Sequence, residues 1–297
     1  MSKDAGAKAL IPPPPADDPD ELKRPHRPPD FYFIDSHAHL DMDDFDADRE
    51  EVILRAEQAG VRAILCPMDV TSLKSIQTAL EMSSRRPHLY SAAGVHPHQA
   101  KLFHPDFLSR IKEFARDKNI RAIGEIGLDF HYDFSSPVEQ RAAFRAQLAL
   151  AKDLRYPAII HSRNAGREIA DAVQAEYFYS GGVLHCFTED WEFAKTMLDW
   201  NFFISFSGIL TFANAQPIRE IAQKLPLTRI MIETDSPYLT PAPFRGIKKR
   251  NEPALVIETA RVLADLKKTS VAEIARATAE NFYKAFRIPA PESRTHI

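Results

Sequence analysis

The segment Tyr32-Phe33-Ile34-Asp35-Ser36-His37-Ala38-His39 joins a short apolar run to a pair of histidines. Aromatic and β-branched residues favour a pleated strand, so the run Tyr32–Asp35 is predicted to form one. Successive side chains of an extended backbone point to opposite faces, which leaves His37 and His39 on the same face, where both imidazoles can approach one ion. The segment therefore predicts a strand that leads directly into two metal ligands.

The same unit, a short strand followed by a helix, recurs along the chain. The eight predicted strands are Tyr32–Asp35, Ala63–Pro67, Leu89–Ala93, Ala122–Gly124, Ala158–Ile160, Gly182–Leu184, Phe202–Ser205 and Ile230–Ile232. Predicted helices include Ala47–Gln58, Leu73–Ser83, Val138–Leu154, Pro253–Leu266 and Val271–Phe286. This alternation is typical of α/β folds with a parallel sheet, and eight units in about 260 residues favour a (β/α)₈ TIM barrel over residues 31–290. No G-x-G-x-x-G turn supports an open doubly wound sheet.

The two ends of the chain are predicted to lie outside the barrel. Residues 1–30 hold eight prolines among charged residues. Prolines remove amide donors and favour extended polyproline II, so this segment is predicted to be a disordered tail. Its functional interpretation is a docking segment for a partner protein. Residues 291–297 are predicted to be a short C-terminal tail.

Composition limits the partners and the compartment. Of the 297 residues 44% are hydrophobic, enough for the core of one large domain, and the net charge of −3 provides no global positive field. Any contact with nucleic acid must therefore be local. Cys66 and Cys186 lack the spacing of a disulfide framework or a C-x-x-C knuckle. No signal peptide is recognisable and no apolar run approaches the ~18 residues that span a bilayer, so a cytoplasmic protein without membrane contact is expected.

Four more ionisable residues follow predicted strands. Glu125 comes after the fourth strand, His161 after the fifth, His185 after the sixth and Asp235 after the eighth. The carboxyl ends of all strands meet at one face of a barrel, so these residues are expected to converge with the histidine pair of the first strand. Imidazole and carboxylate ligands together suit zinc, manganese or iron, and Glu125 is the natural bridge between two ions.

Other residues near the strand ends leave alternatives open. His96 and His98 follow the third strand, where they are expected either to contact substrate and ligand side chains or to belong to ordinary loop structure. Cys186 is expected to be a small buried hydrophobe, and Ser236 lacks the G-x-S-x-G elbow of a serine hydrolase. Ordinary solvated histidines are expected at His26, His88, His104, His131 and His296.

Six motifs resemble those of the TatD family of metal-dependent deoxyribonucleases, which belong to the amidohydrolase-like barrels. They are Ile34-Asp35-Ser36-His37-Ala38-His39-Leu40, Gly94-Val95-His96-Pro97-His98, Ile123-Gly124-Glu125-Ile126-Gly127-Leu128-Asp129-Phe130, Ile160-His161-Ser162-Arg163, Leu184-His185-Cys186-Phe187 and Glu233-Thr234-Asp235-Ser236-Pro237-Tyr238-Leu239. The resemblance covers about residues 31–287, and its last motif is highly specific. It implies a TIM barrel of the metal-dependent hydrolase type.

The resemblance also implies roles for the ligands. Two divalent ions (Mg²⁺, Mn²⁺ or Zn²⁺) are implied, and the six residues that the strand ends indicate are divided between them. One ion is held by His37, His39 and Asp235, the other by His161 and His185, and Glu125 bridges both. The implied enzyme is a deoxyribonuclease, a 3′–5′ exonuclease on single strands that uses a water activated by both ions. Glu125 and Asp235 are the catalytic residues, with Asp235 as the proton acceptor. Further family positions, expected to shape the pocket and its packing, are Asn251, Glu252, Pro253 and Asn281.

Departures from the family pattern lie in substrate loops. The loop 244–251 is longer and more basic than usual, Asn164 stands where the family commonly has Asp, and Thr188-Glu189 replaces Ser-Gly. Phosphate contacts are predicted for Arg163, Arg245, Lys248, Lys249 and Arg250, which otherwise are solvated charges. Stacking of single-stranded bases is predicted for Phe130, Tyr132, Tyr238 and Phe244, which otherwise pack in their loops.

Two other functions are compatible with the sequence. The first is an amidohydrolase-type barrel enzyme that cleaves an ester or amide of a small molecule or an aminoacyl group. Barrels of that kind that use a metal-bridging lysine carry it at the end of the fourth strand, where this chain has Glu125. The second is a scaffold protein without activity, which has no need to converge so many polar groups that are costly to bury.

Overall fold

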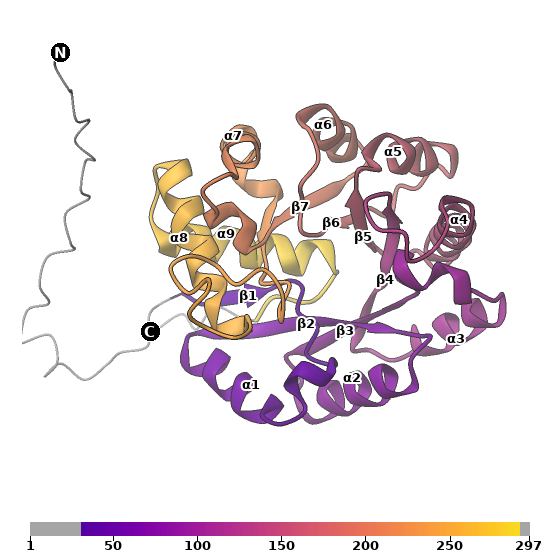
Figure 1. Cartoon of the computed structure of the whole chain (residues 1–297), viewed down its shortest axis with the longest axis horizontal. Coiled ribbons are helices and arrows are strands. Elements are labelled where there is room, and N and C mark those ends of the chain that lie inside the picture. The colour runs from indigo at the N-terminus through magenta and orange to yellow at the C-terminus, as the bar shows by residue number, and fades with distance from the viewer. Residues whose placement is uncertain (1–30, 292–297) are drawn as a thin grey trace, which may run out of the picture. The chain divides into compact units, whose positions relative to one another are not determined.

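The computed structural model describes residues 31–291, and these residues form a barrel of parallel strands surrounded by helices (Figure 1). The eight strands follow chain order around the sheet: β1 (Phe33–Asp35), β2 (Val61–Asp69), β3 (Leu89–Gly94), β4 (Ile120–Asp129), β5 (Ala158–Arg163), β6 (Gly182–Leu184), β7 (Phe202–Phe206) and β8 (Ile230–Ile232). The predicted TIM barrel is thus confirmed. The predicted N-terminal tail, most of the predicted C-terminal tail, His26 and His296 lie outside the described residues.

Helices alternate with the strands and cover the outside of the barrel. They are α1 (Arg49–Gln58), α2 (Leu73–Arg85), α3 (Asp106–Phe114), α4 (Pro137–Leu154), α5 (Gly166–Ala175), α6 (Trp191–Asp199), α7 (Gln216–Lys224), α8 (Val256–Lys267) and α9 (Val271–Ala285). The longest, α4, begins at a capping box in which Ser136 and Glu139 satisfy each other's backbone amides. No helix within residues 31–291 is long and apolar enough to cross a membrane.

The barrel closes between β8 and β1 through a few contacts rather than a full ladder. The amide of Ser36 donates to the carbonyl of Ile232 at 3.1 Å, and the amide of Asp235 donates to the carbonyl of His37 at 2.9 Å. The buried carboxylate of Asp35 accepts hydrogen bonds from the amide and the hydroxyl of Thr234, at 2.9 and 2.5 Å. These bonds hold the segment after β1 against the segment after β8, which brings His37 and His39 beside Asp235.

Helix α9 closes the amino-terminal end of the barrel. Phe282 of α9 and Phe286, which directly follows this helix, pack against a buried layer of inward-facing strand residues that includes Ile34, Leu65 and Phe203. Asn281 donates to the carbonyls of Leu227 and Ile230, at 2.8 and 2.7 Å. Asn281 therefore has a packing role at the start of β8. The apolar plug leaves the carboxyl ends of the strands as the polar end of the barrel.

An ion pair fastens the loop after β8 to helix α1. Arg55 donates to both carboxylate oxygens of Glu252, at 2.8–3.3 Å, and Lys248 lies 3.1 Å from the same carboxylate. Burial alone would raise the pKa of Glu252, but its bonds to Arg55 and Lys248 hold that pKa below its ordinary value. The carboxylate is therefore ionised in the folded protein at neutral pH.

Replacing Glu252 by Gln is expected to lower the free energy of unfolding by about 1–2 kcal/mol at pH 7, because the pair is bidentate but Arg55 is partly exposed. A depressed pKa stabilises the fold above the unfolded-state pKa, and this stabilisation is lost as the pH falls through the folded-state pKa. The difference between wild type and variant, measured by urea unfolding, should thus shrink below about pH 4. A difference that stays constant down to pH 3 would contradict this assignment.

Candidate metal centre

All six predicted ligands converge at the carboxyl ends of the strands. His37 and His39 follow β1, His185 follows β6 and Asp235 follows β8. Glu125 and His161 lie inside β4 and β5 instead of just after them, since these strands extend to Asp129 and Arg163. The two strands are longer than predicted, and the side chains still reach the common cluster.

A bulge in β4 aims Glu125 at this cluster. The register between β4 and β5 steps from Ile123–Ala158 to Ile126–Ile160, so β4 has one extra residue at this point. Such a bulge re-aims the side chain that it carries. Just beyond it, Gly127 has a φ of 148°, and a Cβ at this position would lie 2.0 Å from the carbonyl oxygen of His161. Only glycine permits this close approach of the two strands.

Glu125 presents one carboxylate oxygen to each half of the cluster. Its Oε2 lies 3.2 Å from Nε2 of His37 and 3.7 Å from Nε2 of His39. Its Oε1 lies 2.9 Å from Nδ1 of His161 and 2.6 Å from Nε2 of His185. Asp235 completes the first half, with Oδ1 3.4 Å from Nε2 of His39. This is the arrangement expected of a carboxylate that bridges two ions.

The donor set fits a divalent ion in each half. The Nε2 atoms of His37 and His39 are 3.2 Å apart, as are Nδ1 of His161 and Nε2 of His185. Two imidazole lone pairs at this separation repel unless a proton or a cation lies between them. Two nitrogen ligands of one tetrahedral zinc, at about 2.1 Å from it, are roughly 3.4 Å apart. Among the described residues, the buried Oε2 of Glu125 also has no hydrogen-bond partner.

Both carboxylates of the cluster carry negative charge. Burial alone would raise the pKa of Glu125, but the neighbouring imidazoles, above all His185, hold it well below its ordinary value. Burial acts on Asp235 in the same direction, and its hydrogen bond with His39 and the nearby histidines outweigh it. Two ionised carboxylates among four imidazoles provide the charge and the ligand types that bind divalent metals.

Two further carboxylates lie behind the histidines of the second half. Oδ2 of Asp129 is hydrogen-bonded to Nε2 of His161 at 3.1 Å, and Oε1 of Glu233 lies 3.4 Å from Nδ1 of His185, outside hydrogen-bond geometry. When these outer nitrogens carry the protons, the inner nitrogens turn their lone pairs toward Glu125. Carboxylates placed behind ligating histidines are typical of metal sites. The sequence analysis missed both residues, although Asp129 and Glu233 stand in the same motifs as Glu125 and Asp235.

Helix α4 supports the loops that carry these groups. The side chain of Gln140 accepts from the amide of Asp129 at 2.8 Å and donates to its carbonyl at 2.9 Å. Gln147, two turns further along, makes the same pair of bonds with Val95, at 2.7 and 3.1 Å. Both glutamines are buried. They fix the carboxyl ends of β3 and β4, from which the loops with His96 and Asp129 start.

Replacing Asp129 by Asn is expected to reduce hydrolytic activity and metal affinity by about 10- to 100-fold, the usual effect of losing a carboxylate behind a ligating histidine. Asn keeps an acceptor for the amides of His131 and Tyr132, which Asp129 Oδ1 binds at 2.9 and 3.1 Å. The folded loop should therefore persist, and the thermal midpoint in chelator should barely move. Metal titration by calorimetry measures the affinity, and unchanged affinity would exclude the orienting role.

His96 and His98 lie at the edge of the centre, as their position after β3 suggested. Nδ1 of His96 accepts from the amide of His98 at 3.1 Å, so its Nε2 carries the proton and points at Oε1 of Glu125, 3.2 Å away. Burial lowers the pKa of His96 to about 4, which keeps the ring neutral. His98 instead binds Oδ2 of Asp129 at 2.8 Å. His96 is thus a neutral N–H donor that faces the centre.

The predicted phosphate contacts fall into two groups. Lys248 and Arg250 are paired with carboxylates. Lys248 lies 3.1 Å from Glu252 of the same loop, and Arg250 lies 2.5 Å from Asp48, which ties the loop to the start of α1. The other three are not engaged in this way: Arg163 stacks on Tyr132, Arg245 stacks on Phe212, and Lys249 is exposed. Tyr238 is half exposed, and its ring lies 6.3 Å from that of His39.

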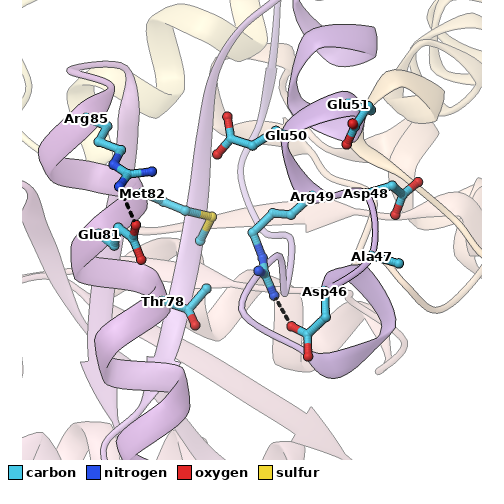
Figure 2. A pocket seen from close by; sticks show the side chains of 10 residues that line it. All are labelled: Asp46, Ala47, Asp48, Arg49, Glu50, Glu51, Thr78, Glu81, Met82 and Arg85. Carbon is cyan, nitrogen blue, oxygen red and sulfur yellow. Dashed lines mark hydrogen bonds and ion pairs between the residues drawn. The ribbon is translucent and has the colours of Figure 1, made fainter.

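A separate pocket lies between the start of α1 and helix α2 (Figure 2). Two ion pairs are formed by residues that line it, Arg49 with Asp46 and Arg85 with Glu81, each at 2.6 Å. The complete lining is Asp46, Ala47, Asp48, Arg49, Glu50, Glu51, Thr78, Glu81, Met82 and Arg85. Acidic residues outnumber basic ones here, so the pocket does not suit a polyanion, and none of its residues belongs to the metal centre.

Comparisons with known proteins agree with the motifs. Residues 34–287 match the family model described as TatD related DNase. An uncharacterized metal-dependent hydrolase, YabD of Bacillus subtilis, is 41% identical over 258 residues, which cover 86% of this chain and 99% of that protein. The 3′-5′ ssDNA/RNA exonuclease TatD of Klebsiella pneumoniae is 39% identical over 226 residues, 75% of this chain and 85% of that protein. The crystal structure of YJJV, a TatD homologue from Escherichia coli, superposes with a TM-score of 0.80 at 30% identity, covering 86% and 98% of the two chains.

Proposed function

The chain belongs to the TatD-related DNase family of metal-dependent hydrolases, and from this premise we propose that it hydrolyses phosphodiester bonds of single-stranded DNA from the 3′ end. The observation that supports this most is the division of Glu125 between two groups of ligands, one at each carboxylate oxygen. Sites with two ions are suited to in-line displacement at phosphorus, where both the attacking and the leaving oxygen need charge stabilisation. The Klebsiella relative, by its name, is an exonuclease of this polarity.

The ions would be held by His37, His39 and Asp235 in one half and by His161 and His185 in the other, with Glu125 between them. When bound, they would polarise the phosphate oxygens and make a water more acidic. Attack of a water on phosphorus would form one P–O bond and break the bond to the 3′ oxygen of the preceding nucleotide, which takes up a proton from solvent as it leaves.

The chain's own residues complete the reaction. Asp235 is ionised and its side chain is 13% exposed, so its carboxylate can take the proton of the attacking water. The Nε2–H group of His96 lies 3.2 Å from Oε1 of Glu125, so it can hold this carboxylate in place between the two groups of ligands. Arg163, at the end of β5, adds a positive charge beside the centre.

The test uses a single-stranded oligonucleotide labelled at its 5′ end, with Mg²⁺, Mn²⁺ or Zn²⁺ and with chelator. Shortening by single nucleotides only when a metal is present is the expected result. A panel of small esters, amides and lactones is tested in parallel. Turnover of one of these with no cleavage of DNA would overturn the proposal in favour of the amidohydrolase-type alternative.

Two of the basic residues predicted to bind phosphate, Lys248 and Arg250, already have carboxylate partners, whereas Lys249 is exposed. Replacing Lys249 by Ala is expected to flatten the plot of log affinity against log salt by about 0.7, the value for one phosphate contact on a single strand. Replacing Arg250, whose charge is already paired with Asp48, should change this slope by less than half as much. Fluorescence anisotropy at several salt concentrations measures both variants, and equal slopes for wild type and Lys249→Ala would exclude the contact.

A further inference from the structure

Two exposed aromatic side chains stand beside the metal centre, on the side of His161. Tyr132 and Phe134 lie in the loop between β4 and α4, are 41% and 53% exposed, and have ring centroids 5.5 Å apart. Large apolar side chains that remain exposed together mark binding surfaces more often than packing. The pair is unexplained by the fold, because neither ring belongs to the buried core.

The aromatic pair is continuous with the centre. The ring of His98 lies 4.6 Å from that of Phe134 and 5.6 Å from that of Tyr132, and it lies 6.0 Å from the ring of His161. A row of rings therefore runs from the ligand His161 outward to the exposed surface. A ligand that extends from the centre along this row meets the exposed rings of Tyr132 and Phe134.

The loop is held rigidly by the same group that orients His161. Oδ1 of Asp129 accepts from the amides of His131 and Tyr132, while its Oδ2 binds His98 and His161. The hydroxyl of Ser135 donates to the carbonyl of His98 at 2.8 Å. A fixed loop loses little conformational entropy when a ligand binds, which favours a binding role.

A positive charge accompanies the rings. The guanidinium carbon of Arg163 lies 4.8 Å from the centroid of Tyr132, and Arg163 belongs to β5, the strand that carries His161. Aromatic faces next to an arginine are the combination that binds single-stranded nucleic acid, in which bases stack while the backbone follows positive charge.

We propose that Tyr132 and Phe134 form a stacking site for an unpaired nucleobase of the substrate strand, with Arg163 bound to an adjacent phosphate. The proposal rests on the proposed nuclease function and names the residues that would recognise its single-stranded substrate: an internal base of a duplex, stacked on both sides by its neighbours, cannot offer a free face to these rings. The site therefore selects single strands.

The test measures affinity in chelator, so that no strand is cut, using fluorescein-labelled oligodeoxynucleotides in which one abasic residue is moved stepwise from the 3′ end. In the wild type, loss of the base at one position near the 3′ end is expected to weaken binding by about 5- to 100-fold, the contribution of one stacked base. In the double variant Tyr132→Ala, Phe134→Ala, the same abasic strand should bind as well as the complete strand. If binding in chelator is too weak to titrate, KM values for the same strands in Mg²⁺ give the ratio between the abasic and the complete strand.

Three variants serve as controls. Tyr179→Ala removes an aromatic residue that is 68% exposed between α5 and β6, toward the other end of the barrel, and should leave the base dependence unchanged. Phe134→Trp should retain the dependence, whereas Phe134→Leu, which keeps apolar area without a ring, should weaken it. A base dependence that is equal in wild type and double variant overturns the stacking site alone. Absence of any binding and cleavage of DNA by the wild type, with every metal tested, overturns the proposed function as well.

Discussion

Replacing Glu125 by Gln is expected to reduce hydrolysis at least about 1000-fold, because the variant loses the charge that the two halves of the centre share. Gln retains one oxygen, but its amide nitrogen cannot bind a cation, so one half loses its carboxylate oxygen. The interactions of bound metals with the transition state are worth several kcal/mol, and 4 kcal/mol corresponds to about 10³-fold in rate. The measurement is the rate of nucleotide release from single-stranded DNA at saturating Mn²⁺.

Metal binding gives a second measure of the same variant. Ligands that bind only the folded state stabilise it, by about 2.7 kcal/mol at a concentration 100 times their Kd. The rise in thermal midpoint that added metal causes in the wild type should therefore be reduced in Glu125→Gln. Glu168→Gln is the matched control, since Glu168 pairs with Arg141 on the outside of the barrel and should affect neither measurement. Activity of Glu125→Gln within tenfold of wild type would show that Glu125 does not bridge two ions.

The bounds of a strand could be predicted where the sequence changes abruptly from apolar to polar residues at its end. The predicted bounds of β6 (Gly182–Leu184) and β8 (Ile230–Ile232) agree with the structure. The prediction for β4 stopped at Gly124, whereas the strand continues to Asp129. Glycine and a charged residue within an apolar run resemble a strand end in the sequence. In the barrel the bulge accommodates Glu125, and the close approach to His161 requires Gly127.

The six residues of the cluster could be named from the sequence because a barrel brings every strand end to one face. The orienting carboxylates could not, because their roles depend on which nitrogen of each histidine faces the centre. That choice is set in three dimensions: Asp129 is hydrogen-bonded to His161, and Glu233 places a carboxylate 3.4 Å from Nδ1 of His185. It fixes the direction of the lone pairs, which residue spacing alone does not reveal.

The basic loop 244–251 offers less free charge than its sequence suggests. Its four positive charges suggested phosphate binding, yet two of them have carboxylate partners. Asp48 and Arg250 are 202 positions apart in the chain, and their pairing depends on how the loop after β8 meets α1. The net charge of a segment therefore overestimates the charge that it offers to a ligand. Lys249 and Arg163 remain as better candidates for contact with a backbone.

Replacing Asp235 by Asn is expected to reduce the rate of hydrolysis by about 10²- to 10⁴-fold, the usual contribution of a positioned general base. Asn fits the site: it has the same shape as Asp, and it tolerates the left-handed backbone that Asp235 adopts, with a φ of 54°. The backbone bond from this residue to His37, at 2.9 Å, can therefore persist. The variant lacks the ionised carboxylate, so its side chain cannot take the proton of the attacking water.

Saturation with metal separates the two roles of Asp235. If Asp235 only ligates, Asn still offers one oxygen, and raising the Mn²⁺ concentration should restore most of the activity. If it also accepts the proton of the attacking water, the rate should stay low when bound metal, measured by elemental analysis, reaches the wild-type amount. Asp190→Asn is the control, because Asp190 caps α6 by accepting from Phe193 at 2.8 Å and Asn caps equally well. Full recovery of Asp235→Asn at high Mn²⁺ would assign proton transfer to another group, and His96 is then unsuited because its neutral ring already carries its proton on the nitrogen that faces the centre.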